Sequence, residues 1–344
     1  MLTLFSKKMA DDCYLSLKIW TEKIVGHGED APPLLINNLG KAGAVGVFDG
    51  MGGAGATVCD SSFGDGYTKA FVASRLVAYS IEVYLNNHLP TDDISVEDMK
   101  AVIKNKLNEE KEKYPPKIKS SLRSKLVRDY PTTIALVTFQ KHEEDLHIDS
   151  YWAGDSHCYL WNKDGFSQIS KDDLEEKNDP MENLHNDSPI SNCVCSDRDF
   201  VIHHKPITLA KEPVIILCAT DGCFGYYQTP MHFEYILKVC LQNAKNEKEW
   251  KELLQNEILE VTGDDCSLSL MAIGFSSFDE LKNSMKSDAT EGMSKLVQLE
   301  RDIADAEQIL VDTKHQYEKI VTSEWEQYKK GYMKYIIDEE NGNA

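Results

Sequence analysis

An apolar stretch that runs into one aspartate and a glycine cluster is the most informative segment of the sequence. Residues 46–55 read Gly-Val-Phe-Asp-Gly-Met-Gly-Gly-Ala-Gly, with Asp49 directly after the apolar run. Two kinds of chemistry fit this segment. Gly50, Gly52 and Gly55 match the Gly-x-Gly-x-x-Gly fingerprint of dinucleotide-binding proteins. Alternatively, the strand end holds the Asp49 carboxylate rigidly as a metal ligand, and Gly50 and Gly52 let backbone carbonyls and water approach.

The context of the segment disfavours the dinucleotide alternative. Asp49 would lie next to a pyrophosphate, where a like charge is costly. No acid follows about 20 residues after Gly55, where a ribose-binding carboxylate is expected. The preceding strands are typical of an antiparallel meander, not of the start of a parallel unit. An NADH titration would settle this alternative.

Further acids lie at predicted strand ends, in the same kind of position as Asp49. One Asp-Gly alone would be interpreted as a turn, but several acids at strand ends indicate a shared site. Carboxylates without His or Cys select hard cations, so Mg²⁺ or Mn²⁺ is expected. These acids are Glu29 and Asp30 after the first strand, Asp155 in a tight turn, Asp221 after an apolar run, and Asp264 and Asp265 before the last strand.

Alternating and continuous apolar patterns predict the elements that would position these acids. A polar stretch at 171–198 predicts a long surface loop. A capping-box-like start at Ser95 supports one of the predicted helices. The expected strands cover 14–20, 33–37, 44–48, 132–139, 146–152, 157–161, 214–219 and 266–273, and the expected helices cover 67–87, 95–113, 231–242 and 246–260.

The character of the chain changes after about residue 279, where strand patterns and proline stop. Apolar or small residues then follow 3-4 spacing, and the pattern slips after Ile320, with Glu324 on the seam. An inter-chain coiled coil and an amphipathic helix lying back on the domain are both compatible with this pattern. The seam is Leu296, Leu299, Ile303, Ala306, Leu310, Thr313, Tyr317 and Ile320, with Trp325, Tyr328, Tyr332 and Tyr335 beyond it.

Composition narrows the class of protein. The chain has 344 residues and a formal net charge of -20, which disfavours binding to nucleic acid or to anionic membranes. The nine cysteines are odd in number and lack Cys-x-x-Cys spacing, so a reduced cytoplasmic protein is expected. The longest apolar run, residues 213–219, is too short to span a membrane, and the N-terminus lacks an apolar segment suited to secretion.

The acidic segments, taken in order, resemble the type 2C metal-dependent serine/threonine protein phosphatases (the PPM family), with Met51 similar to the bacterial branch. The resemblance implies an α+β fold, a four-layer α-β-β-α sandwich of two antiparallel sheets. It implies a catalytic domain at 1–276, and the 3-4 spacing beyond it predicts a helical extension at 277–344 that is a candidate coiled coil. The matching stretches are Glu29-Asp30, residues 47–53, Thr132-Thr133, residues 153–156, residues 217–222 and Gly263-Asp264-Asp265.

The resemblance also implies roles for individual residues. Asp49 would bridge two Mg²⁺ or Mn²⁺ ions, with Asp221 and Asp265 on one ion, and these three are the expected catalytic residues. The other ion would be held by Glu29 and the Gly50 carbonyl, with Asp30 behind them and Asp155 on a weaker third ion. A hydroxide between the two ions would hydrolyse phosphoserine or phosphothreonine in a protein substrate.

The sequence departs from the family pattern at four positions, and three of them, Val25, Gly225 and Cys266, motivate an alternative function. Val25 stands where the family has a phosphate-binding arginine, and Met51 where many eukaryotic members have a histidine acid. Gly225 and Cys266 replace an aspartate and an asparagine near the metals. The alternative is a weak or inactive phosphatase-like scaffold that acts through its C-terminal helix. Because the main carboxylates are intact, we favour an active enzyme, with self-association or a regulatory partner expected at that helix.

Overall fold

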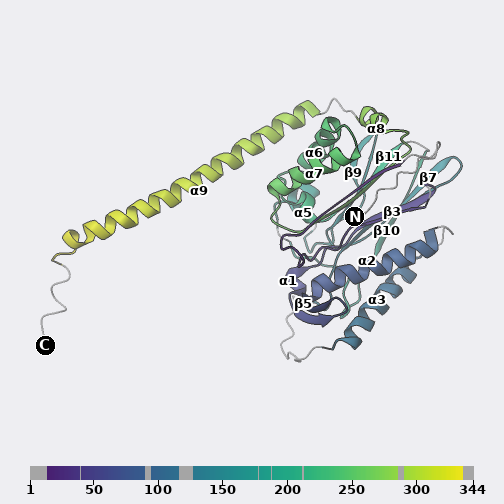
Figure 1. Cartoon of the computed structure of the whole chain (residues 1–344), viewed down its shortest axis with the longest axis horizontal. Coiled ribbons are helices and arrows are strands. Elements are labelled where there is room, and N and C mark those ends of the chain that lie inside the picture. The colour runs from purple at the N-terminus through teal and green to yellow at the C-terminus, as the bar shows by residue number, and fades with distance from the viewer. Residues whose placement is uncertain are drawn as a thin grey trace. The chain divides into compact units, whose positions relative to one another are not determined.

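Two antiparallel five-stranded sheets form the centre of the fold (Figure 1). The computed structural model describes residues 14–38, 40–89, 94–115, 127–176, 178–186, 188–210, 213–285 and 290–335. The first sheet has the order β1 (Tyr14–Thr21), β12 (Cys266–Ile273), β11 (Val214–Ala219), β8 (His157–Asn162) and β9 (Gly165–Gln168). The second has the order β10 (His203–Ala210), β7 (Asp145–Ala153), β6 (Ile134–Lys141), β3 (Ala42–Val47) and β2 (Leu34–Asn38).

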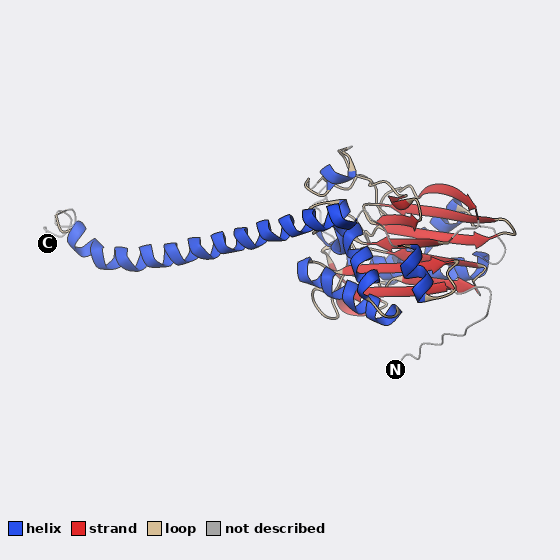
Figure 2. Cartoon of the chain, turned by 90° about the horizontal axis from the view of Figure 1, so that it is seen from above, coloured by secondary structure: helices blue, strands red, loops and turns tan. Residues whose placement is uncertain are grey.

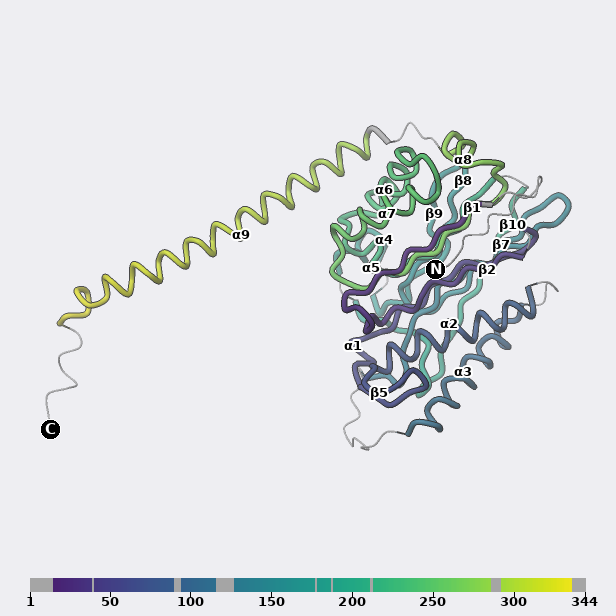
Figure 3. The backbone as a smooth tube through the Cα atoms, viewed as in Figure 1, coloured from purple at the N-terminus to yellow at the C-terminus, as the bar shows by residue number. Residues whose placement is uncertain are grey.

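Helices cover the outer faces of both sheets, which gives four layers (Figure 1). Figure 2 shows the same helices in blue and the strands in red, seen from above. The helices α2 (Lys69–His88) and α3 (Val96–Lys113) run side by side over the second sheet (Figure 3). The helices α6 (Pro230–Asn243), α7 (Glu247–Val261) and α8 (Phe278–Ser284) cover the first. The predicted α-β-β-α sandwich is therefore confirmed.

The space between the sheets is filled by apolar side chains from both of them. Val45 and Val137 come from the second sheet, and Ile216 and Met271 come from the first. Strands β11 and β12 are buried along their whole length, because α6 and α7 cover the face that points away from the second sheet. These two strands are rigid supports for the loops that follow or precede them.

Most predicted elements lie where the sequence placed them, but several observed elements were not predicted, among them the strand β10. A hairpin of β4 (Val58–Ser61) and β5 (Gly64–Thr68) was not predicted, because its polar, glycine-rich strands carry no apolar alternation. Residues 171–198 contain the short helix α4 (Pro180–Asn183), and they are not only a surface loop. Val194 is fully buried, and its backbone exchanges two 3.0 Å hydrogen bonds with Thr132.

The chain divides into two compact units, residues 1–287 and 288–344. The first extends beyond the expected boundary at 276, because Leu281 of α8 and the following Met285 are buried in the core under α7. The second contains one 43-residue helix, α9 (Thr290–Tyr332). Among the residues that the structure describes, no helix is both long and apolar enough to cross a membrane.

Candidate active site

Connections at one edge of the sandwich bring the predicted acids to a single cavity of about 470 Å³. We call it the carboxylate cavity. All seven predicted metal-site positions line it: Glu29, Asp30, Asp49, Gly50, Asp155, Asp221 and Asp265. Its other lining residues are Met51, Gly52, Gly53, Ala54, Ser188, Pro189, Ile190 and Asp264.

Asp49 lies two residues after β3, where two threonines fix its backbone. The Thr133 hydroxyl accepts a hydrogen bond from the Asp49 amide at 3.1 Å, and the Asp49 carbonyl accepts from the Thr133 amide at 2.8 Å. The Thr132 hydroxyl donates to the same carbonyl at 2.6 Å. The threonine pair before β6 therefore positions Asp49, and the short helix α1 (Gly52–Gly55) begins just beyond it.

Asp30 is held by a chain of hydrogen bonds that reaches the last strand. The Thr220 hydroxyl donates to Asp30 Oδ2 at 2.8 Å and accepts from the Ser267 amide at 2.9 Å. Because Thr220 precedes Asp221, one residue links the loop after β1 to the end of β11. Asp221 then begins the short helix α5 (Asp221–Phe224).

Glycines allow two backbone segments to meet under the cavity. A Cβ at Gly222 would lie 1.9 Å from the Asp265 carbonyl oxygen, and a Cβ at Gly50 would lie 2.5 Å from the Glu29 carbonyl oxygen. Neither position has room for a side chain. The expectation that glycines after the strand-end acids permit close backbone approach agrees with this geometry.

Asp265 fastens the loop that carries Glu29. Its carboxylate accepts from the Lys23 amide at 2.7 Å and from the Glu29 amide at 2.5 Å. The neighbouring Asp264 also lines the cavity, and nothing in the sequence distinguishes it from Asp265 as a ligand. In the structure the two residues differ, because Asp265 holds a loop by hydrogen bonds while Asp264 is exposed and adds negative charge.

Burial and mutual repulsion change the acidity of the buried carboxyls. The pKa of Asp49 is raised well above its usual value, first by burial and then by the charges of Asp30 and Asp221. Burial likewise raises the pKa of Asp30 and of Asp221, and Asp49 hydrogen-bonds to both of these side chains. The side chains thus pair with one another through shared protons, since no cation of the protein lies between them.

Asp155 has a raised pKa and an unsatisfied oxygen. It follows Gly154, whose φ of +105° is in the left-handed region and ends β7. Burial and the charge of Asp221 raise its pKa to about 8. Its Oδ1 atom is buried and has no hydrogen-bond partner. A buried carboxylate oxygen without a partner is costly, and a cation would relieve that cost.

None of the described residues that line the carboxylate cavity is a lysine or an arginine. Val25 is 88% exposed and contributes nothing to the lining. Arg75, which the sequence analysis missed, lies behind the cavity and donates to the Gly28 carbonyl at 2.9 Å. Burial lowers its pKa to about 10. This guanidinium supports the loop before Glu29, and only its place on an otherwise apolar helix face could have indicated it.

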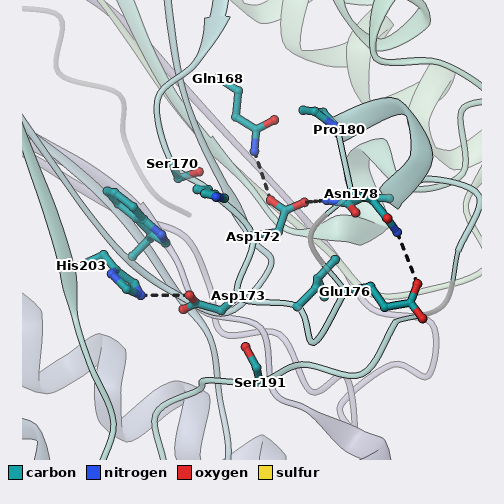
Figure 4. Close-up of a pocket in the computed structure, with 13 residues that line it drawn as sticks. Gln168, Ser170, Asp172, Asp173, Glu176, Asn178, Pro180, Ser191 and His203 are labelled. Atoms are coloured by element: carbon teal, nitrogen blue, oxygen red, sulfur yellow. Dashed lines mark hydrogen bonds and ion pairs between the residues drawn. The ribbon is translucent and has the colours of Figure 1, made fainter.

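A neighbouring cavity of about 500 Å³ is also lined by acids, but histidines pair with two of them, and Figure 4 shows the pair of His203 and Asp173. We call it the histidine–aspartate cavity. Asp172 bonds Asn183 at 2.7 Å and, away from the cavity, His157 at 2.8 Å. His203 bonds Asp173 at 2.9 Å. The sequence analysis gave no role to His203 or to the two aspartates, because a polar loop carries no periodic pattern.

Cys223, two residues after Asp221, offers no competing nucleophile. Burial raises the pKa of Cys223 well above its usual value, and its thiol donates to the Ser267 carbonyl. The described cysteines are all free, and Cys59 alone among them is more than slightly exposed. Burial therefore keeps the other described thiols away from solvent, and we assign the chemistry of the edge to its carboxylates.

The donor set suits hard divalent cations. Its oxygens come from carboxylates and from backbone carbonyls, with the unpartnered Asp155 oxygen among them, and such donors suit Mg²⁺ or Mn²⁺. As the side chains stand, no three Asp, Glu, His or Cys residues in the described ranges converge into a ready-made metal group. The carboxyls that hydrogen-bond to one another would have to release their shared protons to bind a cation.

Comparison with known proteins gives one family and one fold. The family model described as "Protein phosphatase 2C" matches residues 36–260. A search of curated protein sequences finds no significant match. Among solved structures, the catalytic domain of the serine/threonine protein phosphatase PstP, in complex with two manganese ions, is 17% identical with a TM-score of 0.51. The alignment covers 76% of this chain and 99% of that one.

Two further solved structures share the fold. Serine/threonine phosphatase Stp1 from Staphylococcus aureus is 15% identical with a TM-score of 0.50, over 79% of this chain and 99% of that one. A C. elegans sex determining protein is 12% identical with a TM-score of 0.54, over 82% of this chain and 69% of that one. At these identities the likeness concerns the fold, and the family match carries the assignment.

Proposed function

This chain belongs to the protein phosphatase 2C family and is by family a protein serine/threonine phosphatase, and we propose that it works with two divalent cations bound in the carboxylate cavity. The observation that carries the proposal is the convergence of Asp30, Asp49, Asp155 and Asp221 on one cavity, where burial and mutual repulsion raise their pKa values. The substrates are phosphoserine and phosphothreonine side chains of proteins.

An acid-lined cavity repels a phosphate group, so the carboxylates need cations before they can serve this reaction. Asp49 is placed between Asp30 and Asp221 and would bind both cations. Asp221 and Asp265 would complete one site, and Glu29 with the Gly50 carbonyl the other. When bound, the cations supply an activated water and neutralise charge on the phosphate.

The residues of this chain hold the acids in position and define the shape of the cavity. Thr132 and Thr133 hold the Asp49 backbone, and Asp265 holds the Glu29 loop. Asp155 provides a further oxygen for a weaker third cation. Val25 and Met51 provide no charged group for the phosphate or the leaving oxygen, so water must protonate the leaving group. The first compact unit, which includes the predicted 1–276, is the catalytic part.

Hydrolysis of a phosphothreonine peptide with and without Mn²⁺ tests the proposal. We expect activity with Mn²⁺ that EDTA abolishes, and loss of that activity in Asp49→Ala. Calorimetry should show Mn²⁺ uptake by the unsubstituted chain and weaker uptake by the variant. Asp145→Ala, at the exposed start of β7, is the matched control and should behave as the unsubstituted chain does.

Two results would overturn the proposal. Activity that survives EDTA would remove the cations from the mechanism. Mn²⁺ uptake without hydrolysis of any phosphopeptide would instead favour the scaffold alternative, in which the cavity binds metal but performs no reaction.

A further inference from the structure

The helix α9 carries an apolar stripe that continues past the point where the heptad pattern slips. After Tyr317 the stripe moves to Val321 and Trp325, two successive steps of four residues, and then resumes 3-4 spacing. The later residues are thereby displaced by one position from the heptad pattern, and this shift compensates the drift of a heptad pattern around a straight helix. At 3.6 residues per turn, the stripe stays within an arc of about 120°. Its members are Leu299, Ile303, Ala306, Leu310, Thr313, Tyr317, Val321, Trp325, Tyr328 and Tyr332.

The stripe is exposed along the helix. Leu299 is 51% exposed, Ile303 59%, Leu310 52% and Tyr328 64%. Three of its rings cluster, with centroids of Tyr328 and Tyr332 5.6 Å apart and those of Trp325 and Tyr332 5.8 Å apart. A stripe this long and apolar, at coiled-coil spacing, is suited to packing against another helix.

The four outermost residues at each end of the stripe have the same spacing, whereas the central Thr313 and Tyr317 lie outside this symmetry. Leu299, Ile303, Ala306 and Leu310 follow steps of 4, 3 and 4 residues, and so do Tyr332, Tyr328, Trp325 and Val321 read backwards. An antiparallel copy centred between His315 and Gln316 would therefore bring every one of these residues opposite another stripe residue, over about 50 Å of helix. The layers would be Leu299 with Tyr332, Ile303 with Tyr328, Ala306 with Trp325, and Leu310 with Val321.

Side-chain size favours this pairing over a parallel one. The first half of the stripe is aliphatic or small, and the second half is largely aromatic. An antiparallel pair sets the largest ring, Trp325, opposite the smallest side chain, Ala306, which keeps the distance between the helices even. A parallel pair would set Trp325 against Trp325 and Ala306 against Ala306, leaving a bulge and a gap.

Charge favours the same orientation. Residues 296–315 carry five acidic and two basic side chains, and residues 316–335 carry three acidic and four basic ones. An antiparallel pair sets the acidic half of one helix against the basic half of the other, at both ends. A parallel pair would set the two acidic halves together.

We propose that α9 pairs with α9 of a second copy of this chain, antiparallel and centred between His315 and Gln316. The occupant of the stripe is thus the same surface of a second molecule, related by a twofold axis. The pairing joins two phosphatase chains without using any residue of the carboxylate cavity.

Sedimentation equilibrium of the full chain measures the pairing. We expect a dimer mass, and we expect Ile303→Asp to raise the dissociation constant at least about 100-fold, since it buries a charge twice in the dimer. The matched control is Ile309→Asp. Ile309 is 67% exposed on the same helix but lies about 100° from the centre of the stripe, so this variant should stay dimeric. A monomer at all concentrations, or a dimer that Ile303→Asp leaves intact, would overturn the proposal.

Spin labels measure the orientation in the same full-length protein. With Gln316→Cys, the two labels of an antiparallel dimer lie within about 20 Å of each other. With Lys330→Cys they lie about 45 Å apart, because residue 330 then faces residue 301 of the other copy. The labelled but unsubstituted chain gives the background from native cysteines. Short distances at both positions would show a parallel pair and overturn the antiparallel proposal.

Discussion

Two neighbouring cavities of this protein are both lined by acids, yet the acids differ in their partners. In the carboxylate cavity, Asp49 faces other carboxyls, and its pKa is raised well above the usual value by burial and by like charge. In the histidine–aspartate cavity, Asp172 lies beside His157, and hydrogen bonding to that histidine contributes to lowering its pKa despite burial. The pKa of an aspartate is thus raised in one cavity and lowered in the neighbouring one.

The acids of the carboxylate cavity lack a cationic partner within the described part of the protein, whereas Asp172 and Asp173 in the other cavity each have a histidine partner. A fold that buries several carboxyls against one another stores unfavourable interactions, which an external divalent ion can relieve. A fold that pairs each buried carboxyl with a histidine has satisfied it internally. Comparing the partners of each acid therefore distinguishes the two cavities better than counting acids in them.

The largest expected effect is on activity, when one acid is neutralised in each cavity. Asp221→Asn removes a charge from the carboxylate cavity and should lower kcat/KM about 10²–10³-fold. Glu176→Gln removes a charge from the lining of the other cavity and should change kcat/KM less than about twofold. Steady-state kinetics with Mn²⁺ and a phosphothreonine peptide measures both. Equal losses in the two variants would mean that the cavities act as one site.

A second comparison concerns stability. Asp172 and His157 have side chains only 7% and 8% exposed, so Asp172→Asn should lower the free energy of unfolding by about 3 kcal/mol. Asp149→Asn breaks a similar but half-exposed pair with His204 and should cost less than about 1 kcal/mol. Urea unfolding at neutral pH measures both changes.

The pH dependence of that loss has a defined sign. Because the pKa of Asp172 is lowered on folding, its contribution is present above the unfolded value near 3.9 and disappears as the pH falls through the folded value. The deficit of Asp172→Asn should therefore shrink below about pH 4. A deficit that is constant down to pH 2 would show that packing, not the carboxylate, carries the effect.

The smallest expected effect has the opposite sign. The pKa of Asp155 is raised to about 8, so this acid destabilises the fold above the unfolded value near 3.9, and the penalty grows as the pH rises toward 8. Asp155→Asn should raise the Tm of the chain in EDTA by roughly 2–4 °C at pH 7.5. The gain should vanish near pH 4. Thermal unfolding at the two pH values measures it, and a lower Tm at pH 7.5 would contradict the raised pKa.

The sequence predicted most of the strands and the acids at their ends because strand patterns and strand-end acids are local signals. Apolar runs place Asp49 and Asp221 at rigid strand ends, and the sandwich that brings them to one edge was predicted from the family resemblance. Thr132 and Thr133 were matched by family resemblance, and the structure supplies the physical reason, which is their hydrogen bonding to the Asp49 backbone.

What the sequence could not predict depends on contacts between distant segments. Asp172 and His157 pair across a loop without periodicity, and Arg75 supports a loop 47 residues away at Gly28. The β4–β5 hairpin has too few apolar residues to show a strand pattern. The different roles of Asp264 and Asp265 depend on which of the two carboxylates accepts hydrogen bonds from the Lys23 and Glu29 amides. The spacing of residues in the sequence does not predict that choice.

The pairing of β1 with β12 has a consequence for biosynthesis. Thr21 at the end of the first strand lies opposite Cys266 at the start of the last one, so Glu29 and Asp265 are brought together by two neighbouring strands that are far apart in the sequence. A nascent chain cannot assemble the acidic edge until residue 273 has left the ribosome. Fragments released early from translation would lack phosphatase activity altogether.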